Sequence, residues 1–224
     1  MEPSTPLSVA VGDDTADGWL SRALVCLRSG GIVALPTETF YGLAVNAASA
    51  PSVRSVLSLK GYEDKRPLLI LAGSARQVEQ LCPWSRIAGA ADLAAAFWPG
   101  PLTLILPLGP GRTLAACPGR TAAIRVPAHP VPRRLAQAFG GFLTGTSANR
   151  VGQPAARSAP EVVRCFPRGL ELILDGGPTA GQEPSTLVDL SSTTPRLVRA
   201  GVVPPDEVAS ILGCRLASPT GATE

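Results

Sequence analysis

Apolar residues recur along the chain at two spacings, one typical of helices and the other of buried strands. The spacing predicts a helix from Trp19 to Leu27 that ends at Gly30, because glycine readily adopts the left-handed conformation of a helix end. The apolar run 32–35 follows and predicts a buried strand that Pro36 stops. Helical and extended segments alternate in this way along the rest of the chain.

Later segments keep the same alternation. Further strands are predicted over 68–71, 102–106, 122–126, 142–144, 170–174, 186–190 and 197–198. Further helices are predicted over 53–60, from 74, around 93–97, from 158 and over 206–212. Two of these helices begin with the spacing of a capping box, Ser74 with Gln77 and Ser158 with Glu161. The alternation predicts an α/β fold with a mixed, mostly parallel sheet and ligands near the strand ends.

Length and composition limit the domain organisation. The 224 residues fit one domain, and 45% hydrophobic residues suffice for a core without disulfides or metal. We expect a flexible N-terminus over 1–14, one folded domain over 15–212 and a flexible tail over 213–224. The chain shows neither an apolar run of the roughly 18–20 residues that span a bilayer nor a signal-peptide pattern. We therefore expect no membrane attachment and a cytoplasmic location.

Charge, cysteine and histidine content exclude several classes of site. The formal charge of +3 is too small to identify a nucleic-acid binder, although it permits an anionic ligand. The five cysteines are odd in number and show no C-x-x-C spacing, which argues against a disulfide framework and a zinc site. His129 is the only histidine, so we expect no metal site made from protein side chains and a single candidate base for a His-dependent nucleophile.

Polar residues follow the first predicted strand directly. In P-T-E-T-F-Y-G-L at 36–43, Thr37, Glu38 and Thr39 present two hydroxyls and a carboxylate at the strand end. These groups are suited to bind a ligand. The alternative is a simple connection in which the threonines satisfy backbone groups.

A basic loop ends the second predicted helix. In K-G-Y-E-D-K-R-P at 60–67, Lys60, Lys65 and Arg66 lie just before a strand. Cations are favourable at a helix C-terminus, so a solvated charged loop is the structural alternative to a binding loop.

The segment G-T-S-A-N at 145–149 has small residues and hydroxyls after a predicted strand, where backbone N–H groups could approach phosphate oxygens. Neither a Walker loop nor G-x-G-x-x-G is present. The segment also resembles the nucleophile elbow G-x-S-x-G, except that Asn149 replaces the second glycine. A serine hydrolase using Ser147 with His129 therefore stays open as an alternative.

Arg125 stands inside a predicted strand of apolar neighbours, T-A-A-I-R-V-P at 121–127. A half-buried arginine requires an anionic partner. That partner is either a ligand or Asp189, in S-T-L-V-D-L at 185–190.

Taken together, these segments resemble the YrdC-like threonylcarbamoyl-AMP synthases (TsaC), short form without an extra C-terminal domain. The resemblance covers roughly residues 15–210. The matching motifs occur in family order, namely P-T-E-T-F-Y-G-L, the Lys60 loop, W-P-G-P-L-T at 98–103, A-I-R-V-P-A-H-P at 123–130, T-S-A-N at 146–149, S-T-L-V-D-L and V-R-A-G at 198–201. The resemblance implies a YrdC-like twisted, mixed parallel and antiparallel sheet with flanking helices and a concave ligand-binding cleft.

The resemblance also implies an activity. The family joins L-threonine, bicarbonate and ATP, with Mg²⁺, into L-threonylcarbamoyl-AMP and pyrophosphate, for N6-threonylcarbamoyladenosine at tRNA position 37. Implied partners are tRNA or double-stranded RNA and the downstream tRNA threonylcarbamoyl-transferase machinery. Implied catalytic residues are Lys60, Arg125, Ser147 and Asn149. Implied L-threonine contacts are Thr37, Arg125 and Ser185, and implied ATP contacts are Lys60, Thr121, Ser147, Asn149, Arg157 and Arg199.

Two positions depart from the family pattern. The family usually reads K-x-R where this chain has Tyr62, so a phosphate-binding cation is missing there, and Arg66 or Lys65 is a candidate replacement. Ala200 stands where proline is common. These departures leave open a second interpretation, an RNA-binding or regulatory paralogue of the same fold with altered or weak catalysis.

Overall fold

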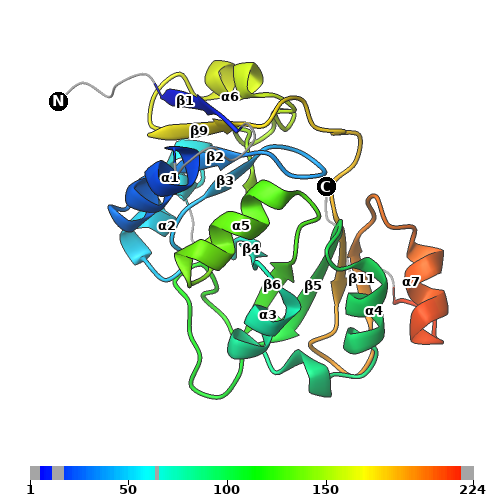
Figure 1. The fold of residues 1–224 in the computed structure, drawn as a ribbon. Coiled ribbons are helices and arrows are strands. Elements are labelled where there is room, and N and C mark those ends of the chain that lie inside the picture. Colours follow the sequence, from blue (N-terminus) through cyan, green and yellow to red (C-terminus); the bar gives the residue numbers. More distant parts are fainter. Residues whose placement is uncertain (1–5, 12–17, 64–65, 218–224) are drawn as a thin grey trace.

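The computed structural model describes residues 6–11, 18–63 and 66–217, whose strands form two mixed sheets (Figure 1). The first sheet has the order β1 (Leu7–Ala10), β9 (Leu172–Asp175), β2 (Val33–Leu35), β3 (Gly42–Ala44) and β8 (Thr146–Ser147). The second has the order β11 (Arg196–Arg199), β10 (Thr186–Asp189), β5 (Leu102–Pro107), β6 (Thr121–Arg125), β4 (Ile70–Leu71) and β7 (Leu143–Thr144).

Both sheets combine parallel and antiparallel pairs. Parallel pairs are β1–β9, β9–β2, β10–β5 and β4–β6. Antiparallel pairs are β2–β3, β3–β8, β10–β11, β5–β6 and β4–β7. The predicted mixed sheet with flanking helices is confirmed, but it is divided into two. The expectation that it is mostly parallel is wrong, because five of the nine strand pairs are antiparallel.

The division occurs at Gly145. This residue separates β7 from β8, and these two short strands belong to different sheets. A Cβ at position 145 would collide with the Leu71 side chain of β4, so the backbone approaches β4 more closely there than a larger residue permits. This crossing brings Ser147 next to β3, where it pairs with Gly42.

Seven α-helices lie within the described residues, together with a 3-10 turn at Trp84–Arg86. They are α1 (Gly18–Arg28), α2 (Ala50–Lys60), α3 (Ala75–Leu81), α4 (Ala90–Phe97), α5 (Pro130–Phe139), α6 (Ala159–Cys165) and α7 (Pro205–Leu212). Figure 1 shows α3, α4 and α7 around the six-stranded sheet and α1 and α2 beside the five-stranded one. None of the helices within 6–11, 18–63 and 66–217 is both long and apolar enough to cross a membrane.

Some local predictions need correction. Leu7–Ala10, within the expected flexible N-terminus, form β1 and pair with β9; residues 1–5 and 12–14 lie outside the described part of the chain. Ser74 caps α3 by accepting from Gln77 N at 3.2 Å, as expected. Ser158 makes no capping hydrogen bond; instead the Glu161 carboxylate accepts from Arg157 N at 2.7 Å.

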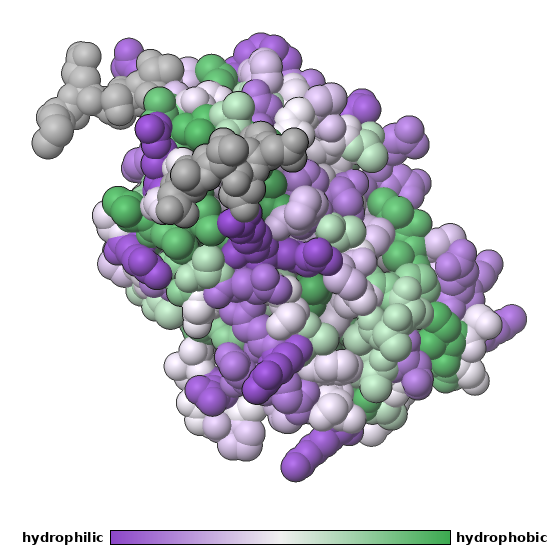
Figure 2. Space-filling view, in the orientation of Figure 1, coloured by the Kyte–Doolittle hydropathy of each residue, from purple (hydrophilic) through white to green (hydrophobic). Residues whose placement is uncertain are grey.

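Helix α5 was not predicted. Its first turn contains two prolines, and His129 caps it by accepting from Val131 N at 3.2 Å through Nδ1. Val131 and Leu135 are buried, while hydrophilic residues run in a band over the centre of the molecule, where α5 lies in Figure 1 (Figure 2). Helix α5 is therefore an amphipathic cover over β4.

Candidate functional site

A cleft of about 580 Å³ is lined by residues of both sheets. The alternation of side chains along the six-stranded sheet creates one wall. In β5 and β6, Leu104 and Ile124 are buried in one cluster with residues of α4, whereas Ile105, Ala123 and Arg125 point to the other face and line the cleft. The sequence therefore places an arginine at the end of an otherwise apolar floor.

The cleft brings together six of the predicted site residues, each from a separate segment of the chain. They are Thr37, Arg66, Arg125, Ser147, Ser185 and Arg199. The other four predicted residues, Lys60, Thr121, Asn149 and Arg157, do not line it.

Arg125 is 4% exposed and lies between the two sheets. Its Nη1 donates to Thr39 Oγ1 at 3.2 Å, and its Nε is 3.8 Å from Glu38 Oε1. Neither Arg125 Nε nor Glu38 Oε1 has a hydrogen-bond partner, and both atoms are buried. Burial lowers the pKa of Arg125, and the charge of Glu38 opposes that shift. The guanidinium position is thus fixed by a hydrogen bond to the Thr39 hydroxyl and by the charge of the Glu38 carboxylate.

Asp189 is not the partner of Arg125, so that alternative is wrong. Asp189 pairs with Arg196 at 2.9 Å and accepts from Ser191 Oγ at 2.6 Å. These bonds lower the pKa of Asp189 against the opposing effect of its burial. Sequence reasoning missed the role of Glu38, although the residue stands in the P-T-E-T motif.

For the motif at 36–43 we considered a ligand contact or a structural connection, and Thr37 fits both. Its Oγ1 donates to Phe40 O at 2.7 Å and accepts from Thr39 N at 3.1 Å, so the hydroxyl does satisfy the local backbone. Thr37 also lines the cleft. Tyr41, which was not predicted as a site residue, lines it too and donates to Gly177 O at 2.8 Å.

Lys60 stabilises the 147–149 turn through hydrogen bonds from its side chain. The side chain is 2% exposed, and Nζ donates to the Ser147 carbonyl, to Asn149 O at 2.8 Å and to Asn149 Oδ1 at 3.3 Å. An ammonium has three protons, so all of them are engaged by this turn. Burial lowers the pKa of Lys60 to about 8. Within the described residues, Lys60 therefore orders the turn and does not reach into the cleft.

Ser147 and Asn149 are linked directly. Ser147 Oγ donates to Asn149 Oδ1 at 2.6 Å, and Asn149 Nδ2 donates to Gln153 O at 2.7 Å. Ser147 lies in β8 and not at a strand-to-helix elbow. His129 Nδ1 is occupied at the start of α5. This geometry does not support the nucleophile–base pair that a serine hydrolase needs.

Ser185, directly before β10, and Arg199, in β11, lie at one edge of the six-stranded sheet. Arg199 Nη2 donates to Ser185 O at 2.9 Å and to Ser185 Oγ at 3.2 Å. Gly201 of the V-R-A-G motif allows this approach, because a Cβ there would collide with the Pro184 carbonyl. Burial lowers the pKa of Arg199.

Thr121 and Arg157 lie outside the cleft lining for different reasons. Thr121 is on the same face of β6 as Ala123 and Arg125, beyond Ala123. Arg157 is exposed and donates from Nη2 to Ala180 O at 3.2 Å. Arg157 thus holds the segment that enters β10.

The departure at position 62 produces a stacked pair. The Arg66 guanidinium carbon lies 3.9 Å from the centroid of the Tyr62 ring, and both side chains line the cleft. A guanidinium over an aromatic face is favourably placed by cation–π attraction. Lys65, the other candidate replacement, lies outside the described residues.

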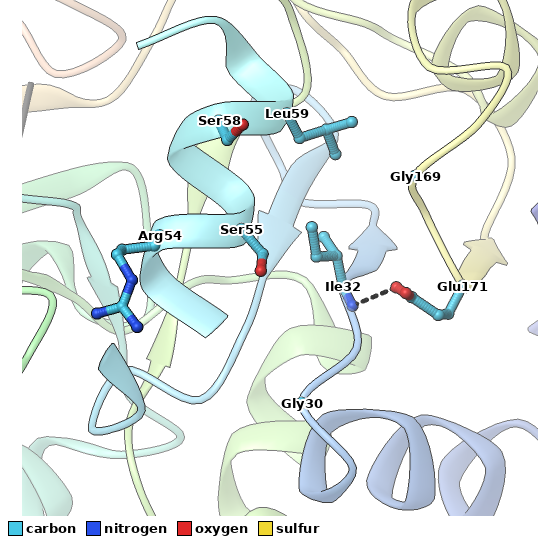
Figure 3. Close-up of a pocket in the computed structure, with 8 residues that line it drawn as sticks. All are labelled: Gly30, Ile32, Arg54, Ser55, Ser58, Leu59, Gly169 and Glu171. Carbon is cyan, nitrogen blue, oxygen red and sulfur yellow. Dashed lines mark hydrogen bonds between the residues drawn. The ribbon is translucent and has the colours of Figure 1, made fainter. Parts of the chain in front are cut away.

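A second hollow, of about 550 Å³, lies between α2 and the start of β9 (Figure 3). Glu171 accepts there from Ile32 N at 2.6 Å, and the Arg54 side chain points away from Glu171. None of the predicted site residues lines this hollow. The cleft between the sheets is therefore the candidate site. Within the described residues, no three His, Cys, Asp or Glu side chains gather to hold a metal ion.

A family model described as "Telomere recombination", for Sua5, YciO and YrdC proteins, matches residues 25–201. The chain belongs to this family. A threonylcarbamoyl-AMP synthase of Alkalilimnicola ehrlichii is 40% identical over 74% of this chain and 88% of the relative. That of Pyrococcus abyssi is 38% identical over 84% of this chain and 55% of the relative, so the chain spans about half of that protein.

Solved structures of the family share the fold. The crystal structure of Pyrococcus abyssi Sua5 complexed with L-threonine has a TM-score of 0.85 and 33% identity, covering 95% of this chain and 62% of that one. Escherichia coli YciO has a TM-score of 0.77 at 24% identity, over 90% and 97% of the two chains, which supports the fold alone.

Proposed function

We propose that this chain is an L-threonylcarbamoyladenylate synthase, a nucleotidyltransferase that makes threonylcarbamoyl-AMP and pyrophosphate from L-threonine, bicarbonate and ATP. The observation that carries the proposal is the cleft that buried Arg125 lines together with Ser185 and Ser147, within a family whose Pyrococcus abyssi member was crystallised with L-threonine. The product would serve tRNA N6-threonylcarbamoyladenosine formation in the cytoplasm, with downstream transferase proteins as partners.

Two ends of the cleft are assigned to two substrates. Arg125 would bind the threonine carboxylate, because a guanidinium fork matches a carboxylate bidentately, with Thr37 and Ser185 beside it. ATP would lie toward Ser147 and Thr121, over the turn that Lys60 and Asn149 hold, and would reach back to Arg199, which is hydrogen-bonded to Ser185. Mg²⁺ would arrive with ATP as part of that substrate.

The reaction needs orientation more than a nucleophile. The threonine amine forms a bond to the carbon of bicarbonate with loss of water, or to CO₂ with loss of an amine proton. An oxygen of the resulting carbamate then attacks the α-phosphorus. The bond from the α-phosphorus to the bridging oxygen breaks, and pyrophosphate leaves. Holding these groups in line supplies much of the rate, and cations stabilise the charge on the transferring phosphoryl group.

The test is pyrophosphate release from ATP and bicarbonate, with and without L-threonine, followed by mass analysis of the adenylate. We expect release that depends on L-threonine and a product with the mass of threonylcarbamoyl-AMP. Salt-sensitive RNA binding without pyrophosphate release would instead favour the RNA-binding paralogue.

Arg66 is our candidate for the missing phosphate contact. Strand β4 runs parallel to β6 with Ile70 opposite Ile124, so the chain enters β4 from the end of β6 where Thr121 lies. This is the end assigned to ATP. The Tyr62 ring under the guanidinium would orient its N–H groups.

Replacing Arg66 with alanine is expected to raise the Kd for ATP about tenfold, since a charge-assisted hydrogen bond is lost at an exposed position. Tyr62→Leu should weaken ATP binding in the same direction, whereas Tyr62→Phe keeps the stacking face and should bind as the parent does. Calorimetry measures all three, with Arg164→Ala on exposed α6 as the matched arginine control. An unchanged Kd for Arg66→Ala would remove this residue from the site.

A further inference from the structure

The W-P-G-P-L-T motif at 98–103 has no role in the proposed reaction, yet it ends in the one hydroxyl of β5. Trp98 Nε1 donates to Leu102 O at 2.7 Å, and Thr186 N donates to Pro101 O at 3.0 Å. These bonds align β5 with β10. They place Thr103 Oγ1 at 2.8 Å from Ser185 Oγ. Thr103 is fully buried, with an exposed fraction of 0%.

The direction of this hydrogen bond follows from the partners of the two hydroxyls. Among the described residues, Ser185 Oγ is the only hydrogen-bond partner of Thr103 Oγ1. If Ser185 donated to Thr103, the Thr103 proton would be buried without an acceptor, which costs free energy. If Thr103 donates, both protons are accounted for, because the Thr103 proton meets Ser185 and the Ser185 proton is left for the cleft.

Arg199 strengthens this assignment. Its Nη2 also donates to Ser185 Oγ, at 3.2 Å. A hydroxyl oxygen has two lone pairs, so donors from Thr103 and Arg199 use both. Ser185 then has no acceptor capacity left and offers only its proton to a ligand.

We infer that Thr103 is a positioning residue that makes Ser185 a hydrogen-bond donor to the bound amino acid. The ligand atom at Ser185 is therefore an acceptor, a carboxylate or hydroxyl oxygen, and not the ammonium group. The inference rests on the proposed function for the identity of that amino acid.

A double-mutant cycle on L-threonine binding tests the inference. The Kd is measured by calorimetry for the unsubstituted protein, Thr103→Val, Ser185→Ala and the double variant, with Thr103→Ser as the conservative control. We expect Thr103→Val to raise the Kd about three- to tenfold, the range of one net hydrogen bond. In the Ser185→Ala background the same change should have no effect, and Thr103→Ser should bind as the parent does.

The outcomes separate the inference from the function. If the unsubstituted protein fails to bind L-threonine, the proposed function is wrong, and the inference loses its ligand with it. If it binds, an equal effect of Thr103→Val in both backgrounds, or no effect in either, overturns the inference alone. Melting curves check that Thr103→Val folds, and Thr103→Ala takes its place in the cycle if it does not.

Discussion

Replacing Arg125 with alanine is expected to raise the Kd for L-threonine at least about a hundredfold. A guanidinium–carboxylate pair forms two charge-assisted hydrogen bonds, each worth about 1.5–3 kcal/mol. Arg125 is 4% exposed, so little water is available to replace those bonds. Calorimetric titration with L-threonine measures the change. Arg164→Ala, with a side chain that is 69% exposed on α6, is the matched control and should bind normally.

The Arg125→Ala variant requires a second variant as a control for folding, because the substitution leaves the Glu38 carboxylate without its cation. Removing one member of a buried pair typically costs about 3–5 kcal/mol of stability. The double variant Arg125→Ala with Glu38→Gln removes both charges and should melt closer to the parent while still failing to bind. If this folded double variant bound L-threonine with the parental Kd, Arg125 would not be the residue that binds the threonine carboxylate.

Lys60→Met is expected to slow pyrophosphate release at least about a hundredfold and to lower the melting temperature. The substitution leaves three oxygen acceptors of the 147–149 turn without their donor, and an unsatisfied buried group costs about 1–3 kcal/mol. The turn that carries Ser147 would then lose its fixed position. Arg54→Met, exposed on the same helix, is the control and should leave rate and melting unchanged. A fully active Lys60→Met protein would contradict this role.

The free energy of unfolding is expected to depend on pH differently in the parent protein and in Lys60→Met. The pKa of Lys60 is lowered from 10.5 to about 8 on folding, so between these values the unfolded chain binds more protons than the folded one. The free energy of unfolding therefore rises with pH in this window through Lys60. Urea titrations from pH 7 to 10.5 should show the parent gaining stability relative to Lys60→Met above pH 8. Parallel curves would mean that the lysine keeps its ordinary pKa.

The sequence predicted the parts of the fold in which a hydrophobic period extends over several turns or residues. Helices α1, α2 and α7 and strands β5, β6 and β9 are of this kind. The short strands β2, β4 and β7 were predicted because they lie within apolar runs. Strands β3 and β8 were missed because they overlap the motifs 36–43 and 145–149, whose polar and glycine residues indicate turns. The split into two sheets was not predictable, because it depends on which distant strands pair with one another.

The site shows the same contrast. Motif resemblance predicted site residues of which some share one cleft and others do not line it. Those in the cleft are Thr37, Arg125, Ser147, Ser185 and Arg199, and those outside its lining are Lys60, Thr121, Asn149 and Arg157. The resemblance did not predict which residues form hydrogen bonds and ion pairs with these side chains. Asp189 is excluded as the partner of Arg125 because β5 lies between β10 and β6, a strand order that no local pattern encodes. Glu38 comes from a loop of the other sheet and could be paired with Arg125 only in three dimensions.

Only Gly145 separates β7 of one sheet from β8 of the other. At this point the chain passes from one wall of the cleft to the other through a single residue, and Ser147 follows two positions later. Gly145 therefore sets the position of Ser147 relative to β7 and β4, which lie in the other sheet. Since a Cβ at this position would collide with Leu71, a larger residue there would push the two walls apart and displace Ser147 from Gly42.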